Sequence, residues 1–534
     1  MNKSRWILVV WMVATMMVIS LVGAGCGPAE TEEPAPEEEE PTPEEAEDTD
    51  EESPLIVRME ADPDTLDPHK SESIFDAGIV EQMMEALVDI DFEGTPQLLL
   101  AEDYEVLEEG QVWRFYLRDN VKYHNGAVMT ADDVKYSIER AVDPDTAYPR
   151  RGRIDMIEEV EVVDNLTVDV LLRYPSATLL PGISAVPIIP KDLHLADSDA
   201  FAQSPVGTGP FKFKDWHIGE KVEVERFEDY WAGYPNLSGV VFLNIPESSV
   251  AALELEAGSI DVMYNLSPED LARYEDDDSI HVDTIEGANY RTMALNNAIE
   301  PLDDVRVRQA INYGINREAI VDTVWPGTGT PAVGPFPRVS WAFSEQIPYY
   351  PHSGDPERAK TLLEEAGYGD GFELEYIIAQ REGEERESLL IQDQLSEVGV
   401  DVQITTVEWS VLVDRLFSFD YEACRVGITQ VPEPDTLVYQ WYHSSAIGGM
   451  NFLQFSNEEM DNLLDAGRME PDQDKRKEIY VEIATLVYEL APTVITYHEL
   501  RATGYRAEIE GIKSHTSNLM KICRPSWGPN VRKN

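Results

Sequence analysis

The sequence has few of the residues that build metal and redox sites. It contains three cysteines, Cys26, Cys424 and Cys523, and its nine histidines are scattered along 534 residues without an H-E-x-x-H or similar cluster. Zinc sites need several Cys or His ligands at short, regular spacings. We therefore expect neither a metal nor a cofactor, and the spacing of the cysteines does not decide whether Cys424 and Cys523 form a disulfide.

Motifs of the common enzyme classes are also missing. The chain has no G-x-S-x-G, no G-x-x-x-x-G-K-[ST], and no G-x-G-x-x-G that opens a helix after a strand. These absences argue against a serine hydrolase, a P-loop nucleotidase and a dinucleotide-binding enzyme. Carboxylates are too numerous for one pair to stand out as general acid and base. The sequence therefore predicts a binding protein rather than an enzyme.

Basic residues are scarce. Against 102 Asp and Glu there are only 41 Lys and Arg, which leaves a formal net charge of −61. Nucleic-acid binding depends on neutralising phosphates with Lys and Arg, so this balance argues against it. It argues equally against a basic membrane-binding face. The acidic excess is typical of a strongly hydrated surface in salty surroundings.

The amino terminus carries the features of a secretory signal in order. Lys3 and Arg5 precede an apolar run over residues 6–22, and small residues at 23–25 precede Cys26. We assign residues 1–25 to a signal peptide, and the end resembles a lipobox in which Cys26 is acylated. Gly23 departs from the usual Leu at its position. An unmodified Cys26 behind an ordinary signal peptide, or an uncleaved anchor, are the alternatives.

Residues 26–53 form an acidic segment that has no Lys or Arg and no large apolar side chain. Such a segment cannot bury enough surface to offset the entropy of ordering, and its like charges keep it extended. We expect it to be a disordered tether that holds a folded body away from the membrane.

From residue 54 the patterns of strands and helices alternate. Thr130 and Asp133 predict a helix start with a capping box, and Asp355-Pro356 opens a second helix that Gly367 ends. Residues 400–405 alternate apolar and polar side chains, as in a strand. This alternation of elements predicts an α/β fold with mixed sheets.

Four motifs, in order along the chain, resemble the oligopeptide/dipeptide/nickel-binding proteins of ABC transporters, solute-binding family 5. They are Leu66-Asp67-Pro68-His69; Trp113-Arg114-Phe115-Tyr116-Leu117 with the following residues to Ser137; Val206-Gly207-Thr208-Gly209-Pro210-Phe211 with Tyr230-Trp231; and residues 304–311, Asp-Val-Arg-Val-Arg-Gln-Ala-Ile. The resemblance covers the chain from residue 55 onward.

The resemblance implies a two-lobed periplasmic-binding-protein fold whose chain crosses a hinge twice. Lobe I would hold residues 54–296 plus 499–534, with an extra subdomain at about 91–204, and lobe II residues 297–498. The protein would act as a monomer that delivers a ligand, a peptide or a related oligomer, to an ABC permease in the membrane. A receptor that presents its ligand to a membrane sensor is the alternative.

The same resemblance suggests residues that contact the ligand. They are Asp62, Tyr290, Trp409, Gln430, Tyr497 and His498. Peptide-binding relatives carry Gly-Trp and then an Asp that pairs with the ligand's ammonium before the Pro that corresponds to Pro432; here Ile428 replaces the Trp and Gln430 is nearest to the Asp. An unpaired buried ammonium is strongly unfavourable. We therefore expect aromatic faces and neutral hydrogen bonds to dominate, which also admits an oligosaccharide.

Overall fold

The computed structural model describes residues 53–71, 73–92, 94–381, 383–428, 433–516, 520–523 and 530–533. The predicted signal peptide, Cys26, the tether up to residue 52, and Gln430 lie outside these ranges. Within them, no helix has the length and apolar character needed to cross a membrane.

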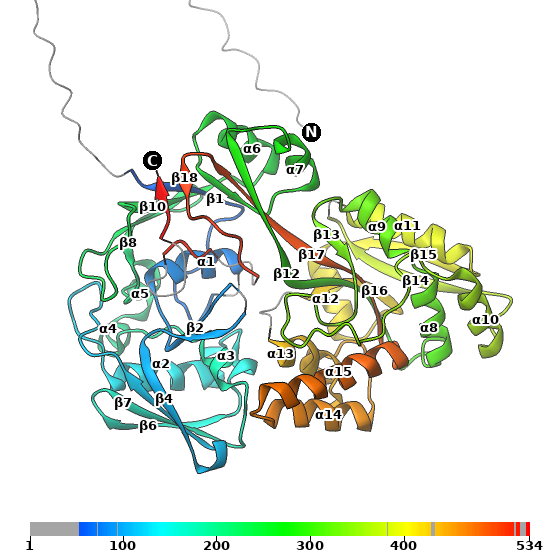
Figure 1. The fold of residues 1–534 in the computed structure, drawn as a ribbon, viewed down its shortest axis with the longest axis horizontal. Helices are drawn as coiled ribbons and strands as arrows, with labels where there is room; N and C mark the ends of the chain where they lie inside the picture. Colours follow the sequence, from blue (N-terminus) through cyan, green and yellow to red (C-terminus); the bar gives the residue numbers. More distant parts are fainter. Residues whose placement is uncertain are drawn as a thin grey trace, which may run out of the picture. The chain divides into compact units, whose positions relative to one another are not determined.

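An eleven-stranded mixed sheet runs through the body in the order β15-β14-β16-β12-β17-β11-β1-β10-β9-β8, with β13 paired to β17 (Figure 1). Its strands are β1 (Leu55–Met59), β8 (Phe211–His217), β9 (Lys221–Arg226), β10 (Gly239–Asn244), β11 (Val262–Tyr264), β12 (Ile280–Leu295), β13 (Gly329–Pro331), β14 (Phe372–Ala379), β15 (Val400–Val407), β16 (Ala423–Ile428) and β17 (Thr493–Arg506). Strand β1 is parallel to β10 and β11, whereas β12 and β17 are antiparallel. The predicted α/β class with mixed sheets is confirmed.

Strands β12 and β17 join the two lobes. Residues 280–286 of β12 pair with residues 500–506 of β17, the part of β17 that also pairs with β11. Residues 290–294 of β12 pair with residues 493–498 of β17, and the same part of β12 pairs with β16. The register shifts between Glu286 and Tyr290, before the predicted boundary at residue 296. The chain thus passes between the lobes on two paired strands, as the two-lobed fold requires, while the boundaries at residues 296 and 498 stay a prediction.

Smaller sheets and the helices complete the lobes. A four-stranded sheet contains β4 (Ala101–Leu107), β5 (Val112–Leu117), β7 (Thr167–Leu172) and β6 (Ile157–Asp164), and two-stranded sheets pair β2 (Val88–Ile90) with β3 (Pro96–Leu98) and β18 (Ile509–Glu510) with β19 (Arg532–Lys533). The helices are α1 (Ile74–Met83), α2 (Ala131–Val142), α3 (Leu179–Ile183), α4 (Lys191–Ala196), α5 (Ser198–Gln203), α6 (Ser248–Ala257), α7 (Pro268–Tyr274), α8 (Val305–Gly314), α9 (Arg317–Val324), α10 (Pro356–Ala366), α11 (Glu384–Ser396), α12 (Trp409–Phe417), α13 (Pro434–Tyr442), α14 (Glu458–Met469) and α15 (Gln473–Leu490), with short 3-10 turns at Glu108–Gly110, Pro144–Thr146, Arg151–Arg153 and Ser444–Ala446.

Local signals set several of these bounds. Thr130 and Asp133 form the predicted capping box at the start of α2. Asp355 caps α10, and Gly367 ends it in the left-handed region at φ 92°. The apolar face of α2 packs over the four-stranded sheet, where Phe115, Ile138 and Val170 are fully buried. Apolar burial at about 25 cal/mol per Å² supplies most of the driving force for such a core.

The two parts of the third motif, Gly207-Thr208-Gly209 and Tyr230-Trp231, meet around a buried carboxylate, Glu85. Its two oxygens accept hydrogen bonds from Thr208 Oγ1 (2.9 Å), Tyr230 Oη (2.6 Å) and Trp231 Nε1 (3.0 Å). A buried charge needs such partners, because an unpaired one costs several kcal/mol. The Gly-Thr-Gly and Tyr-Trp motifs are therefore held together by Glu85, far from them in the sequence.

Cys424 and Cys523 are both buried and are not joined to each other by a disulfide.

Candidate functional site

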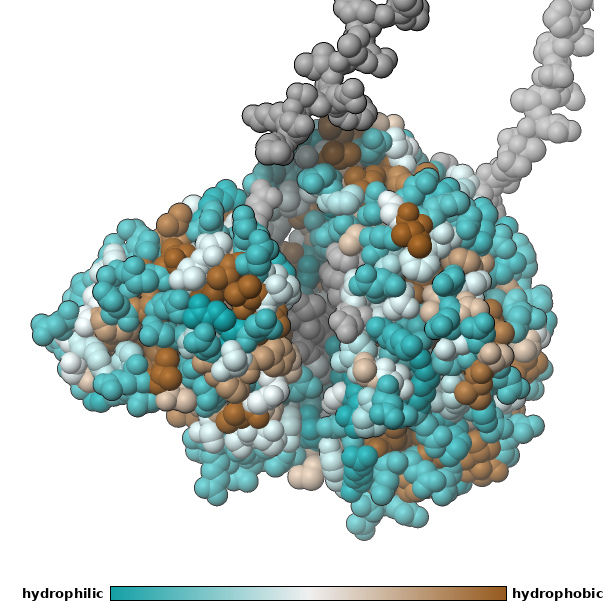
Figure 2. Space-filling model, turned by 180° about the vertical axis from the view of Figure 1, so that it is seen from behind, coloured by the Kyte–Doolittle hydropathy of each residue, from teal (hydrophilic) through white to brown (hydrophobic). Residues whose placement is uncertain are grey.

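A cavity of about 620 Å³ lies where loops of the two lobes face each other. One wall follows β10 and β11, at residues 247–249 and 265–273, and the other contains Trp325, Arg381, Arg425 and Tyr497. Because β1, β10 and β11 are parallel, the loops after them gather at one edge of the sheet, where α/β proteins commonly bind ligands. In Figure 2 the surface, which is mainly hydrophilic, is hollowed between the lobes.

Loops on the lobe II side gather for the same reason. Strands β14, β15 and β16 are parallel neighbours. Arg381 follows the end of β14 and Trp409 follows the end of β15. The topology therefore brings these two separated loops to one edge of lobe II.

Arginine dominates the cavity wall, although the chain as a whole is strongly acidic. Six arginines and five carboxylates line it: Arg273, Arg291, Arg381, Arg386, Arg425 and Arg501, with Glu247, Glu269, Asp270, Glu384 and Glu499. The wall is therefore rich in charge of both signs, with one more cation than anions.

Arg425 is fully engaged within the protein. Its guanidinium donates to Glu384 Oε1 (2.7 Å), Glu387 Oε2 (2.9 Å) and Tyr497 Oη (3.1 Å), and only 4% of its side chain is exposed. Burial opposes the charge, but the carboxylates of Glu387 and Glu384 outweigh it and raise the pKa of Arg425 above its ordinary value. Arg425 is therefore a structural residue of the wall, because its guanidinium is already bound by side chains of the protein.

Glu499 lies between two arginines. It is paired with Arg291 and, at 2.7 Å, with Arg501, and Asn289 also donates to it at 3.2 Å. Burial acts against ionisation, yet the two guanidinium groups lower the pKa of Glu499 to about 2. One carboxylate thus faces two cations, so this part of the wall keeps an excess of positive charge.

Arg381 lines the cavity and is exposed. It makes no ion pair with any carboxylate in the described part of the chain. Its guanidinium lies over the indole of Trp409 at 4.2 Å, and 47% of Trp409 is exposed. Burial and the nearby Arg291 and Arg425 lower the pKa of Arg381, although Glu384 opposes this. An anion beside Arg381 would relieve that repulsion, and Trp409 holds the guanidinium in place.

The structure separates the other residues suggested from the sequence. Tyr497 lines the cavity, 2% exposed, and stacks on Trp325 with the ring centroids 5.6 Å apart. Tyr290 and His498 are completely buried, edge to face at 6.0 Å. Asp62 accepts a hydrogen bond from Trp216 Nε1 at 3.4 Å and is not among the residues that line the cavity. Tyr497 therefore lies on the arginine wall and Trp409 contacts Arg381 without lining the cavity, whereas Tyr290 and His498 lie beneath the surface.

The arginines themselves were missed from the sequence. A signal was present: Arg425 interrupts the apolar strand Ala-Cys-Arg-Val-Gly-Ile at residues 423–428, and a charge on a buried strand needs a partner or a function. Among the described residues no group of His, Cys, Asp and Glu side chains could hold a metal ion.

Comparisons with known proteins agree with this geometry. The model of "Bacterial extracellular solute-binding proteins, family 5 Middle" matches residues 95–449. The chain is 30% identical to Heme-binding protein A of Haemophilus influenzae over 77% of this chain and 80% of the relative, and 28% identical to the Dipeptide-binding protein of Escherichia coli over 86% and 91%. Among solved structures, DppA of Helicobacter pylori in complex with the peptide STSA superposes with a TM-score of 0.77 at 25% identity, covering 90% of this chain and 98% of the other.

Proposed function

Because the chain belongs to family 5 of the bacterial extracellular solute-binding proteins, we propose that it captures a short peptide outside the cytoplasm and delivers it to an ABC importer. Proteins of this family are binding proteins, not enzymes, and they act outside the cytoplasm with a membrane permease. The identity of the ligand, the lobe boundaries and the lipid anchor at Cys26 belong to the proposal.

The observation that carries the peptide assignment is the guanidinium of Arg381 on the cavity wall, which has no carboxylate partner among the described residues. Every unmodified peptide ends in a carboxylate, which matches the planar fork of an arginine. The exposed face of Trp409 beside it offers an apolar surface for the adjoining peptide unit or side chain. An uncharged oligosaccharide would leave Arg381 without a partner.

The amino end of the ligand needs a different partner from the one in the peptide-binding relatives. The opposite wall carries Glu247 and Glu269, both exposed. We assign the ammonium to this lobe I wall, because a carboxylate there would replace the Asp that is missing near Gln430. The ligand would then bridge the lobes, with its carboxylate on lobe II and its ammonium on lobe I.

Contacts between the lobes already exist beside this cavity and far from it. Arg386 of α11 lies 3.8 Å from Glu269 of α7, and the Ala177 amide donates to the Arg468 carbonyl at 3.0 Å. An exposed ion pair of this length contributes little by itself. Closure would therefore depend on the ligand, as a transport receptor requires.

Mass spectrometry of the molecules released from the purified protein by denaturation tests this function. We expect short peptides from the parent and a strongly reduced yield from Arg381→Gln, with the parental yield from Arg358→Gln, which removes the same charge from an exposed residue of α10 that does not line the cavity. Recovery of neutral sugars without peptides would contradict the peptide assignment. Equal peptide yields from all three proteins would contradict the role of Arg381.

A further inference from the structure

The two lobes also touch at a place that lies apart from the arginine-lined cavity. On the side of lobe I are the 3-10 turn at Arg151–Arg153 and residues 174–177, which lead from β7 into α3. On the side of lobe II are α13 and the carboxyl-terminal end of α14, and Figure 1 shows α3 beside α13. No described residue of these segments lines the cavity of about 620 Å³.

The end of α14 depends on lobe I for one of its hydrogen bonds. The last carbonyl groups of an α-helix have no donor within the helix and need partners elsewhere. The Gly467 carbonyl accepts a hydrogen bond from Arg476 Nε at 2.8 Å, inside lobe II, whereas the Arg468 carbonyl accepts one from the Ala177 amide of lobe I at 3.0 Å. When the lobes separate, this carbonyl and this amide must bond to water instead, so their hydrogen bond belongs to the closed arrangement.

A glycine allows the turn of lobe I to come close to α13. A Cβ atom at Gly152 would lie 2.9 Å from Nε2 of Gln440, closer than an ordinary van der Waals contact. Gly152 is not among the glycines with a positive φ, so its backbone conformation would accept a side chain. The missing side chain therefore matters for the contact between the lobes and not for the turn itself.

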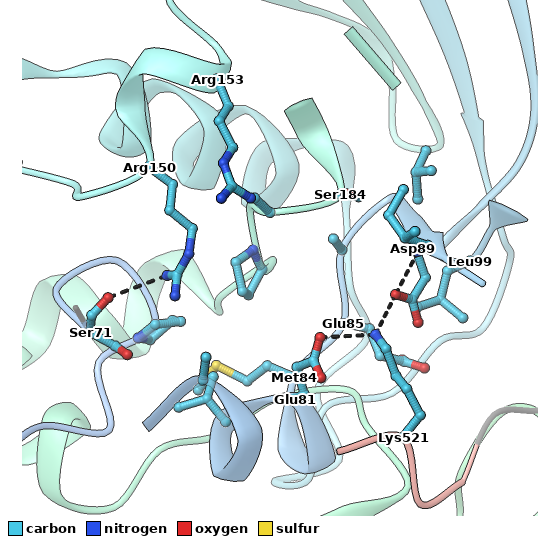
Figure 3. A pocket seen from close by; sticks show the side chains of 18 residues that line it. Ser71, Glu81, Met84, Glu85, Asp89, Leu99, Arg150, Arg153, Ser184 and Lys521 are labelled. Carbon is cyan, nitrogen blue, oxygen red and sulfur yellow. Dashed lines mark hydrogen bonds and ion pairs between the residues drawn. The ribbon is translucent and has the colours of Figure 1, made fainter. Parts of the chain in front are cut away.

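The turn is anchored within lobe I by the arginines around Gly152. Arg151 Nε donates to the Val142 carbonyl at 2.7 Å, and Arg150 donates to the Ser71 carbonyl at 3.3 Å. Figure 3 shows the side chain of Arg150 directed into a cavity of about 100 Å³ inside lobe I, which Lys521 also lines. These side chains point into their own lobe, so the backbone at Gly152 is the part of the turn that meets lobe II.

The partner surface in lobe II is equally well held. The guanidinium of Arg468 donates to the two oxygens of Asp435 at 3.0 and 2.8 Å and lies over the ring of Tyr439 at 3.4 Å, which ties the end of α14 to α13. Burial raises the pKa of Tyr174 in lobe I, and the charge of Arg468 opposes this rise, as expected for groups that face each other across the contact. A contact between two preorganised surfaces loses little conformational entropy when it forms.

We infer that this contact is a latch that stabilises the closed form, so that ligand affinity depends on residues outside the ligand cavity. A hydrogen bond whose two groups bond to water in the open form shifts the ratio of closed to open molecules by only about fivefold. The latch therefore leaves closure under the control of the ligand, while it lowers the ligand concentration that closure needs. The inference follows from the two-lobed fold and does not depend on the peptide assignment.

Hydrogen exchange of the Ala177 amide, measured by mass spectrometry on the ligand-free protein, reports the latch directly. We expect this amide to exchange about fivefold faster in Gly152→Leu, because the added side chain meets Gln440 and separates the lobes. Gly152→Leu combined with Gln440→Ala should restore the parental rate, since the shorter side chain at position 440 makes room for the leucine. The control is Glu220→Leu, which places the same side chain on the exposed turn before β9, at the far edge of the sheet, and should leave the rate unchanged.

Calorimetry with the tripeptide Ala-Leu-Ala then tests the effect on affinity. The dissociation constant should rise about fivefold in Gly152→Leu and return to the parental value in the double variant. Gln440→Trp enlarges the same contact from lobe II and takes the place of Gly152→Leu if circular dichroism shows that the latter does not fold. An unchanged Ala177 exchange rate, no recovery in the double variant, or a parental dissociation constant despite faster exchange would overturn the inference. Failure of every variant and of the parent to bind the tripeptide would count against the proposed function alone, because the exchange rates are measured without a ligand.

Discussion

Replacing Arg425 by Met should strongly destabilise lobe II, because the change leaves two buried carboxylates facing each other. Glu384 and Glu387 are 5% and 0% exposed, and Arg425 donates one hydrogen bond to each. Charge-assisted hydrogen bonds contribute about 1.5–3 kcal/mol each, and breaking a buried pair by removing one partner costs about 3–5 kcal/mol. We expect a loss of about 4 kcal/mol at neutral pH.

Urea titration followed by circular dichroism measures this loss. Arg415→Met is the matched control, because Arg415 pairs with Glu375 at 2.8 Å but remains 24% exposed, so its loss should cost no more than about 1 kcal/mol. Adding Glu384→Gln and Glu387→Gln to Arg425→Met should recover much of the stability. A loss in Arg425→Met as small as in the control would refute the argument that this site is dehydrated.

Four further predictions concern other parts of the chain. Trp409→Ala should weaken binding of the copurifying ligand at least tenfold, about 1.4 kcal/mol, by calorimetry, because it removes the face that supports Arg381; an unchanged affinity would contradict this. His124 accepts a hydrogen bond from the Gly207 amide and contacts the Gly209 carbonyl, and burial lowers the pKa of His124 to about 4. The free energy of unfolding should therefore fall as the pH drops from about 6.5 to about 4, and it should fall less steeply in His124→Gln. Parallel curves of unfolding free energy against pH for the parent and His124→Gln would contradict this prediction. The melting temperature should rise from dilute buffer to molar NaCl, because salt screens the net charge of −61, and a flat curve would show that the charges are paired. Cys26→Ala should release the protein from the membrane fraction and abolish lipid labelling, whereas a parent without the label would disprove acylation.

The helix and strand signals of the sequence were reliable where they depend on neighbouring residues. The capping box at Thr130, the start of α10 after Asp355 and its end at Gly367 appear where the sequence predicts them. Strand β15 occupies the predicted alternating segment from residue 400. Caps, turns and periodicity act within a few residues, so one stretch of chain contains all the information.

The candidate site was only partly predictable. The motifs pointed to Tyr497, which lies on the arginine wall, and to Trp409, which contacts Arg381 of that wall. They also pointed to Tyr290 and His498, which the pairing of β12 with β17 turns into the core. The sequence of a strand shows which side chains lie on the same face, but only the elements that pack on the strand decide which face is buried.

By itself, then, the sequence determined the α/β class, the family and the strong acidity of this protein, because motifs, periodicity and composition are properties of the chain. The tertiary structure decided the charge of the binding surfaces. Arg425 meets Glu384 and Tyr497, and Arg150 shares a cavity with Lys521, only after distant segments have packed. Whether an arginine is neutralised or remains available to a ligand depends on those long-range partners and on how much water the packing excludes. Neither can be predicted from the neighbouring residues in the sequence.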